Sequence, residues 1–203
     1  MAFRPVLAGA LSLLAGSALL AALPTPTEAA RPAAAAETYA IDADHSAILF
    51  RTGHLGVSDA WGRFNVFSGS FTYDADKPEN MSVTVEVQAD SIDTNVEKRD
   101  EHLRSADFFN AKQFPKLTFA SKRIAKQSDG VYTLTGDLTL LGKTQSVETE
   151  FRVIGFMESE LTGARRGAST EFTISRKDFG MTYGGDMLGD EVLVTVALEG
   201  IRQ

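Results

Sequence analysis

Cysteine is absent from the 203-residue sequence, and basic side chains are fewer than acidic ones. The absence of cysteine excludes disulfides, thiol chemistry, cysteine-ligated metals and a lipoprotein anchor. The 20 lysines and arginines stand against 27 aspartates and glutamates, which gives a net charge of −7. Nucleic acids and anionic membrane surfaces require a basic face, so this charge argues against either as the main partner. Without cross-links, a hydrophobic core has to supply the stability.

The first 36 residues have the pattern of a signal peptide followed by a short linker. One positive charge, Arg4, precedes an apolar run over residues 6–23, and clusters of small residues follow that run. Signal peptidases cut at such residues, whereas an uncleaved membrane anchor is the alternative for a run of this length. We expect cleavage between Ala30 and Glu37, export to the periplasm, and one mature domain over residues 37–203. That domain keeps 18 basic and 26 acidic residues, a net charge of −8.

Beyond residue 36 apolar and polar side chains alternate, and a period of two is typical of strands with one buried face. In an early segment Ile48, Phe50, Thr52 and His54 share one face. Short turns separate the segments, one of them a glycine-bearing loop at residues 141–144, and no long helical crossover intervenes. We therefore predict eight or nine antiparallel strands. The same alternation recurs over residues 81–87, 117–119, 132–140, 147–153, 172–174 and 192–198.

The predicted fold class is all-β, an eight-stranded antiparallel barrel with one short helix. Closure is favoured because it removes the unpaired edge strands of an open sheet. A barrel of eight strands can hold one small ligand in its interior. The charged segment over residues 93–104 breaks the alternation and predicts the helix, with Thr94 or Asn95 as its N-cap.

Aromatic residues are plentiful, with 13 phenylalanines and one tryptophan. They form either an ordinary packed core or the wall of a ligand cavity, because such a cavity needs bulky apolar walls and a few polar groups that orient the ligand. Strand parity places Phe50, Phe119, Phe151 and Phe172 on inward faces. Other aromatic candidates for the cavity are Trp61, Phe67, Phe108 and Phe179.

Four polar residues are candidates for orienting a ligand: His54, His102, Asp100 and Arg176. A histidine on an inward face needs a hydrogen-bond partner. For His54 this partner is either a neighbouring protein group or the head group of a ligand. For the segment from Arg99 to His102, the alternatives are a part in the cavity mouth and a purely structural attachment of the helix to the barrel.

Metal and hydrolytic sites have little support in the sequence. The three histidines, His45, His54 and His102, lack the close spacing of common metal sites. No Gly-x-Ser-x-Gly motif is present, and the glycines over residues 180–189 lack the strand-to-helix context of a phosphate loop. We expect no metal, no cofactor and no catalytic residues, and a hydrolase remains the weaker alternative.

Several separated motifs resemble the YceI family of lipid-binding proteins, and the resemblance extends from Tyr39 to the C-terminus. The most specific motif is Arg99-Asp100-x-His102-Leu103-Arg104-Ser105-x-Asp107-Phe108-Phe109. The others are Asp44-His45-Ser46-x-Ile48-x-Phe50-x-x-x-His54-Leu55-Gly56, Gly62-x-Phe64, Ser91-Ile92-Asp93-Thr94, Phe114-Pro115-x-Leu117-Thr118-Phe119, Gly136-x-Leu138-Thr139-x-x-Gly142-x-Thr144 and Arg176-x-Asp178-Phe179-Gly180.

The resemblance implies a lipocalin-like barrel with an elongated hydrophobic cavity for a polyisoprenoid chain. The ligand would be an isoprenoid quinone, a polyprenyl phosphate or another long-chain amphiphile, and the location would be the periplasm. The resemblance also implies a binding protein and not an enzyme. Transient membrane contact and a homodimer are compatible with such a lipid carrier. The rival hypothesis is a stress-response or interaction protein whose barrel is filled by its own aromatic residues.

The predicted site combines the aromatic wall with a polar mouth. We expect His54 or His102 to contact the head group of the lipid, with Asp100 orienting one imidazole, because a head group stripped of water needs new hydrogen bonds. The full set of predicted ligand-binding residues is Phe50, His54, Trp61, Phe67, Asp100, His102, Phe108, Phe119, Phe151, Phe172 and Phe179.

Overall fold

The computed structural model describes residues 36–203, so the expected signal peptide and nearly all of its linker lie outside the described residues. Eleven strands, one α-helix and four short 3-10 helices make up this domain. The strands are β1 (Glu37–Ile41), β2 (Ala47–His54), β3 (Ser58–Phe64), β4 (Phe67–Tyr73), β5 (Ser82–Gln88), β6 (Ile92–Asp93), β7 (Lys116–Ser128), β8 (Val131–Leu140), β9 (Lys143–Ser159), β10 (Gly163–Ser175) and β11 (Leu188–Arg202). The helices are η1 (Ala43–His45), η2 (Pro78–Asn80), η3 (Ala89–Ser91), α1 (Glu97–Arg104) and η4 (Gly185–Met187).

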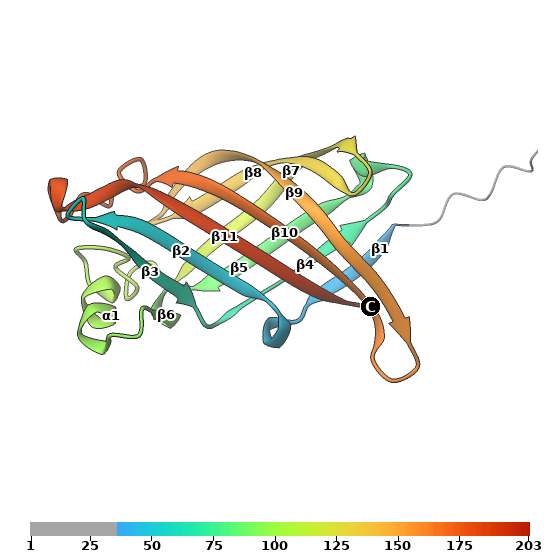
Figure 1. Cartoon of the computed structure of the whole chain (residues 1–203), viewed down its shortest axis with the longest axis horizontal. Coiled ribbons are helices and arrows are strands. Elements are labelled where there is room, and N and C mark those ends of the chain that lie inside the picture. The colour runs from blue at the N-terminus through green and yellow to red at the C-terminus, as the bar shows by residue number, and fades with distance from the viewer. Residues whose placement is uncertain (1–35) are drawn as a thin grey trace, which may run out of the picture. The chain divides into compact units, whose positions relative to one another are not determined.

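Eight strands close into an antiparallel barrel in the order β1-β4-β5-β7-β8-β9-β10-β11 (Figure 1). Closure comes from β1, which pairs with β4 on one edge and with the last residues of β11 on the other, through Tyr39 opposite Arg202 and Ile41 opposite Gly200. The predicted eight-stranded antiparallel barrel is therefore confirmed. Three further strands extend it, because β2 pairs with the first part of β11, β3 pairs with β2, and β6 pairs with β3.

Side-chain alternation explains the barrel locally. On β8, Tyr132, Leu134 and Gly136 are buried and alternate with half-buried polar residues. The hairpin between β8 and β9 turns on two residues, Leu141 and Gly142, whose φ angles are 53° and 70°. Two successive positive φ angles are typical of the type I′ turn, whose twist matches that of the flanking strands. The predicted short hairpin loop is thus present.

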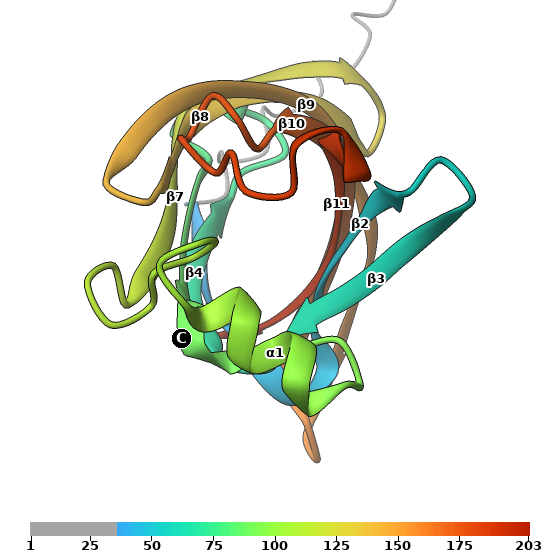
Figure 2. The ribbon, with the colours of Figure 1, turned by 90° about the vertical axis from the view of Figure 1, so that its left-hand side faces the viewer.

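Helix α1 lies at one end of the barrel, below β3 in Figure 1, and crosses the rim of the sheet when the barrel is viewed along its axis (Figure 2). Neither Thr94 nor Asn95 is its N-cap, contrary to prediction. The N-cap is Val96, which makes no side-chain capping hydrogen bond. Asn95 has a φ of 63°, and this left-handed residue brings the chain into the helix one position later than predicted.

The core consists of three clusters of buried residues along the barrel. One lies near α1 and includes Phe64, Phe67 and Ile92, and a second includes Tyr132 and Ile124. The third joins Phe108, Leu140, Phe179 and Met181, and so packs the loops that follow α1 and β10 against the hairpin of β8 and β9. None of the helices in the described part of the chain is both long and apolar enough to cross a membrane.

Candidate functional site

The interior of the barrel contains a cavity of about 630 Å³. Known small-molecule sites have volumes of roughly 300–1,000 Å³, so this cavity is large enough for a ligand. Its wall is formed by inward side chains of the barrel strands and by α1 with the loops on either side of it. The strands contribute mostly aliphatic and phenylalanine side chains, among them Ile48, Val85, Leu134, Val194 and Val196.

A second cavity of about 80 Å³ continues the first one. Five residues line both cavities, at the place where the two meet: Val83, Leu134, Thr170, Val196 and Leu198. Because all five lie on barrel strands, the two cavities follow the interior of the barrel. The resulting space is elongated.

Seven of the eleven predicted ligand-binding residues lie in the wall of the larger cavity. An eighth, Phe151, lines the smaller cavity, where its ring stacks on Tyr132 with centroids 5.1 Å apart. The four phenylalanines that strand parity places on inward faces therefore all line one of the two cavities. The seven residues of the larger cavity are Phe50, His54, Trp61, His102, Phe108, Phe119 and Phe172.

Phe67, Asp100 and Phe179 lie outside the walls of both cavities. Phe67 packs with Phe64 and Val87 in the cluster near α1. Phe179 is only 2% exposed and is enclosed by the third cluster. Aromatic composition could not separate these residues from cavity residues, because a core position and a wall position have the same local sequence pattern.

Two glycines in strands make room for the rings of Phe50 and Phe119. A Cβ atom at Gly62 of β3 would overlap the ring of Phe50, and one at Gly136 of β8 would overlap the ring of Phe119. Each ring therefore occupies the side-chain position of a glycine on the neighbouring strand. This arrangement keeps the rings close to the wall and leaves the centre of the barrel open. A glycine inside an alternating strand is a sign of such a close approach.

The mouth of the cavity lies at the α1 end and contains His54 and His102. His54 is the last residue of β2 and is exposed, and its ring makes no hydrogen bond within the described part of the chain. His102 Nε2 lies 2.8 Å from Asp107 Oδ2, and the ring packs edge-on against Phe108 and Tyr183, with centroids 5.0 Å away in each case. Both imidazoles border the apolar cavity.

The predicted role of Asp100 in orienting an imidazole is wrong. Asp100 is buried, and its Oδ1 accepts hydrogen bonds from Thr94 N at 2.9 Å and from Thr94 Oγ1 at 2.5 Å. Arg99 Nε donates to the same Thr94 hydroxyl at 2.7 Å. These contacts support the alternative interpretation of this segment, a structural attachment of the helix. Asp107 is the carboxylate that orients His102, and sequence reasoning missed it.

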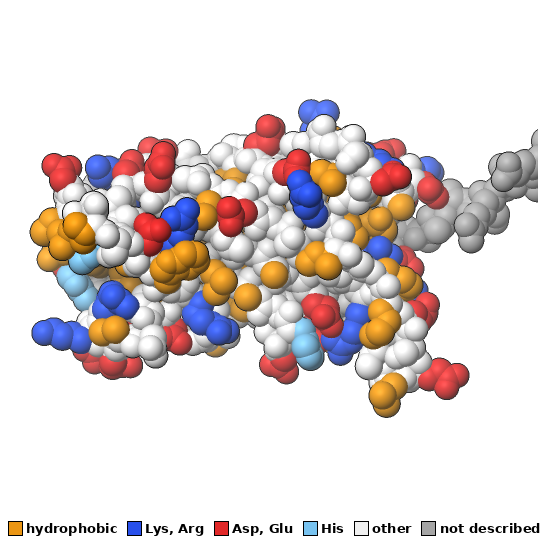
Figure 3. Space-filling view, in the orientation of Figure 1, with side chains coloured by type: hydrophobic (Ala, Val, Ile, Leu, Met, Phe, Trp, Pro, Cys, Tyr) orange, Lys and Arg blue, Asp and Glu red, His pale blue; other side chains and the backbone are white. Residues whose placement is uncertain are grey.

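Large apolar side chains are exposed around the same mouth. Leu55 and Val57 lie between β2 and β3, Trp61 lies on β3, and Met187 ends η4; their exposed fractions lie between 54% and 80%. The backbone N–H of Leu55 donates to the carbonyl of Met187 at 2.8 Å, so the two loops are joined. Figure 3 shows hydrophobic side chains at this left-hand end of the molecule. We call these four residues the apolar rim.

Arg176 fixes the loop on the other side of the mouth. It is 3% exposed, and all five of its guanidinium N–H groups donate to backbone carbonyls, those of Met181, Tyr183, Gly185, Leu188 and Gly189, at distances of 2.7–3.3 Å. Arg176 lines the cavity, yet it has no donor left for a ligand. The sequence-based candidate role of Arg176 in orienting the ligand is therefore wrong, because its donors hold the loop.

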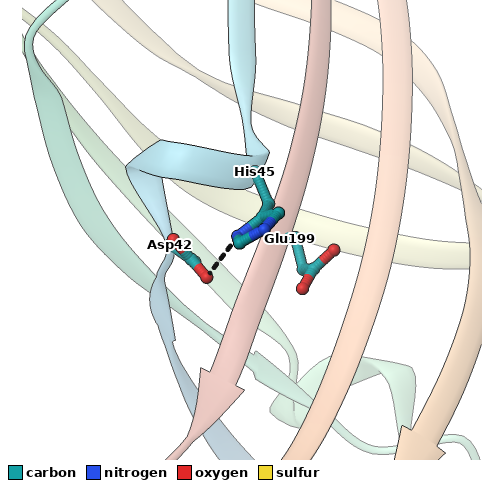
Figure 4. A group of neighbouring side chains, drawn as sticks. All are labelled: Asp42, His45 and Glu199. Carbon is teal, nitrogen blue, oxygen red and sulfur yellow. Dashed lines mark hydrogen bonds and ion pairs between the residues drawn. The ribbon is translucent and has the colours of Figure 1, made fainter. Parts of the chain in front are cut away.

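The structure does not bring the three histidines together. His45 precedes β2 and His54 ends it, a separation of roughly 30 Å at the rise of an extended strand. His45 lies instead beside Asp42 and Glu199 (Figure 4). Arg165 donates to Asp42 Oδ2 at 2.6 Å and to Glu199 Oε1 at 2.5 Å, and its hydrogen bond lowers the pKa of Asp42. The carboxylates are therefore already paired, and the group ties η1 to β10 and β11.

Comparison with known proteins gives a consistent result. The YceI-like domain family matches residues 39–200. A UPF0312 protein of Shewanella putrefaciens is 37% identical over 195 residues, which cover 95% of this chain and 97% of the relative. The crystal structure of BcnA from Burkholderia cenocepacia has a TM-score of 0.71 at 24% identity and covers 78% of this chain and 98% of its own. A polyisoprenoid binding domain from Saccharophagus degradans has a TM-score of 0.65 at 16% identity, with coverages of 81% and 98%.

Proposed function

This chain belongs to the YceI-like domain family, and from this premise we propose that it binds one long-chain isoprenoid lipid inside the barrel. The lipid would be of the quinone or polyprenyl phosphate type, and the protein would carry or sequester it in the periplasm. The observation that carries the proposal is the elongated cavity of about 630 Å³ with its aliphatic and aromatic wall. A barrel filled by its own aromatic residues would lack this space. The structural neighbour described as a polyisoprenoid binding domain supports the same ligand class.

Burial of the chain supplies the binding energy. Each methylene group that leaves water gains roughly 0.8 kcal/mol, so every five-carbon unit inside the barrel adds several kcal/mol before the cost of ordering the chain. A polar head group loses hydrogen bonds to water if it is drawn into the same space. The stable orientation therefore keeps the head group at the mouth and the hydrocarbon chain in the interior.

A hydrolase has less support. Ser46 is adjacent to His45, but its hydroxyl donates to the carbonyl of Asp42 at 2.6 Å and approaches that of Glu199 at 3.4 Å. The His45 ring faces the carboxylate of Asp42. A nucleophilic serine needs a base that accepts its proton, and this geometry does not supply one.

The apolar rim is suited to contact with a membrane surface. Tryptophan and other apolar side chains at the mouth would touch the bilayer where an isoprenoid lipid has to leave it. The acidic exterior, by contrast, disfavours adhesion to anionic lipids over the rest of the molecule. We propose that loading occurs with the mouth against the bilayer.

The experiment that tests this function starts from protein purified without detergent from the periplasmic fraction. We expect an N-terminus between Ala30 and Glu37, and about one long-chain isoprenoid per chain in an organic extract analysed by mass spectrometry. Delipidated protein mixed with neutral vesicles that contain an isoprenoid lipid should also acquire that lipid, as measured after gel filtration. A natively folded sample with an empty extract and no uptake would reject the carrier function.

The head-group contact is tested at the two mouth histidines. Replacement of both His54 and His102 by glutamine keeps bulk and hydrogen-bonding capacity but removes the imidazoles. If they hold the head group, we expect the protein to stay folded while its affinity for the lipid falls by about 1–3 kcal/mol. The matched control is His45→Gln, because His45 lies before β2, away from the mouth. Equal dissociation constants for the wild type and the folded double variant would exclude this contact.

A further inference from the structure

The barrel end opposite α1 contains a partly buried ion pair. Arg166 of β10 points inward, and its side chain is 12% exposed. Its guanidinium carbon lies 3.7 Å from the ring centroid of Tyr73, and Nη2 lies 3.3 Å from Glu37 Oε2. Nε donates to Tyr39 Oη at 3.2 Å. We call Glu37, Tyr39, Tyr73 and Arg166 the end wall.

The end wall is held from several strands at once. Glu37 and Tyr39 come from β1, Tyr73 from β4 and Arg166 from β10. The hydroxyl of Tyr39 donates to Glu37 Oε2 at 2.5 Å, which lowers the pKa of Glu37, while burial raises the pKa of Tyr39. At neutral pH the wall therefore contains a carboxylate, a neutral tyrosine and a guanidinium. Arg202 also donates to Glu37, at 3.1 Å.

The end wall faces the lipid cavity. Arg166 and Tyr73 line the smaller cavity of about 80 Å³, which shares five lining residues with the larger one. A hydrocarbon chain that extends from the mouth past these shared residues would thus reach the guanidinium of Arg166. Up to that point the side chains that the chain meets are almost all apolar. Beyond the mouth, where Asp59, Arg99 and Arg176 line the larger cavity, the next charged group along the interior is Arg166, a paired cation.

A hydrocarbon cannot replace the contacts of the end wall. Displacing Arg166 would separate it from Glu37, from the hydroxyl of Tyr39 and from the aromatic face of Tyr73. The loss of these contacts together outweighs what one additional methylene group gains. Chain units beyond this point would have to fold back or remain outside the mouth. Either outcome removes the gain of further burial.

We propose that the end wall sets the length of isoprenoid chain that the barrel accepts, with Arg166 and Tyr73 as the specificity-determining residues. This inference rests on the proposed function, since it concerns the same cavity. It assigns a role to a charged pair that lipid burial alone does not require. The wall limits the depth of insertion, and the mouth holds the head group.

The test is a binding series with isoprenoid alcohols that differ by one five-carbon unit, measured on delipidated protein. For the wild type, affinity should rise with each unit, by about fourfold per newly buried methylene at most, and then stop rising at a defined length. Arg166→Met replaces the cation by an apolar side chain of similar length. We expect this variant to continue gaining affinity for at least one unit beyond the wild-type limit.

Arg165→Met is the matched control, because Arg165 is the neighbouring arginine but pairs with Asp42 and Glu199. It should retain the wild-type limit. If Arg166→Met does not fold, Tyr73→Leu removes the ring beneath the guanidinium and leaves the ion pair intact, and it should move the limit in the same direction. Folded variants with an unchanged limit would overturn the length selection alone. Failure of every alcohol to bind to the wild type would reject the proposed function together with it.

Discussion

Replacement of Arg176 by methionine is expected to lower the free energy of unfolding by at least about 4 kcal/mol. The substitution removes the guanidinium donors from five backbone carbonyls, of which that of Gly189 keeps a hydrogen bond from Thr52 Oγ1 at 3.1 Å. Each buried acceptor that is left without a partner costs about 1–3 kcal/mol before relaxation. The loop between β10 and β11 has no other group that could supply five donors from one point. We expect it to open and to expose Phe179 and Met181, which it holds in the third core cluster.

Urea denaturation followed by circular dichroism measures this effect. Arg176→Lys should be intermediate, since an ammonium group has three donors and lacks the planar geometry of guanidinium. Lys177→Met is the control, because Lys177 is exposed and adjacent in the chain. It should change stability by less than about 0.5 kcal/mol. If Arg176→Met were as stable as Lys177→Met, the loop would be held by something other than the guanidinium.

Arg176 also illustrates what the sequence could and could not predict. Its inclusion among the polar candidates was correct in so far as it lines the cavity. Its five acceptors, however, come from a loop without regular alternation, and their convergence depends on the tertiary path of that loop. The same limit applies to His102, whose carboxylate partner is Asp107 and not Asp100. The alternation of apolar and polar residues along a strand does not predict the side-chain partners of residues in irregular segments.

Alternation along the strands, by contrast, predicted the inward faces well. The parity that placed Phe172 inward extends along β10 through Thr170 and Ala168 to Arg166, and all four residues line one of the two cavities. The inward-facing guanidinium of Arg166 could therefore have been predicted by extending the strand by six residues towards its N-terminus. The break between β1 and β2 was harder to predict from the sequence. The 3-10 helix η1 separates these two strands, and both of them pair with the same edge of β11.

Phe179→Ala should lower stability more than Phe172→Ala does, whereas Phe172→Ala should lower the affinity for the ligand more. Phe179 is 2% exposed and fully surrounded by core residues, so its truncation should cost about 3–5 kcal/mol. Phe172 already has one side towards the cavity, where truncation removes fewer protein contacts. We expect a loss below about 3 kcal/mol for Phe172→Ala.

Binding should follow the reverse order. Truncation of Phe172 removes apolar surface that a bound chain would cover, and the loss of such contacts should lower the affinity for an isoprenoid alcohol by about tenfold. Phe179→Ala should bind with an unchanged dissociation constant under conditions in which it is folded. Urea midpoints without ligand and binding isotherms with ligand give the two quantities separately. A loss of affinity in folded Phe179→Ala would extend the binding site into the third core cluster, whereas unchanged affinity in Phe172→Ala would remove β10 from the ligand-contacting wall.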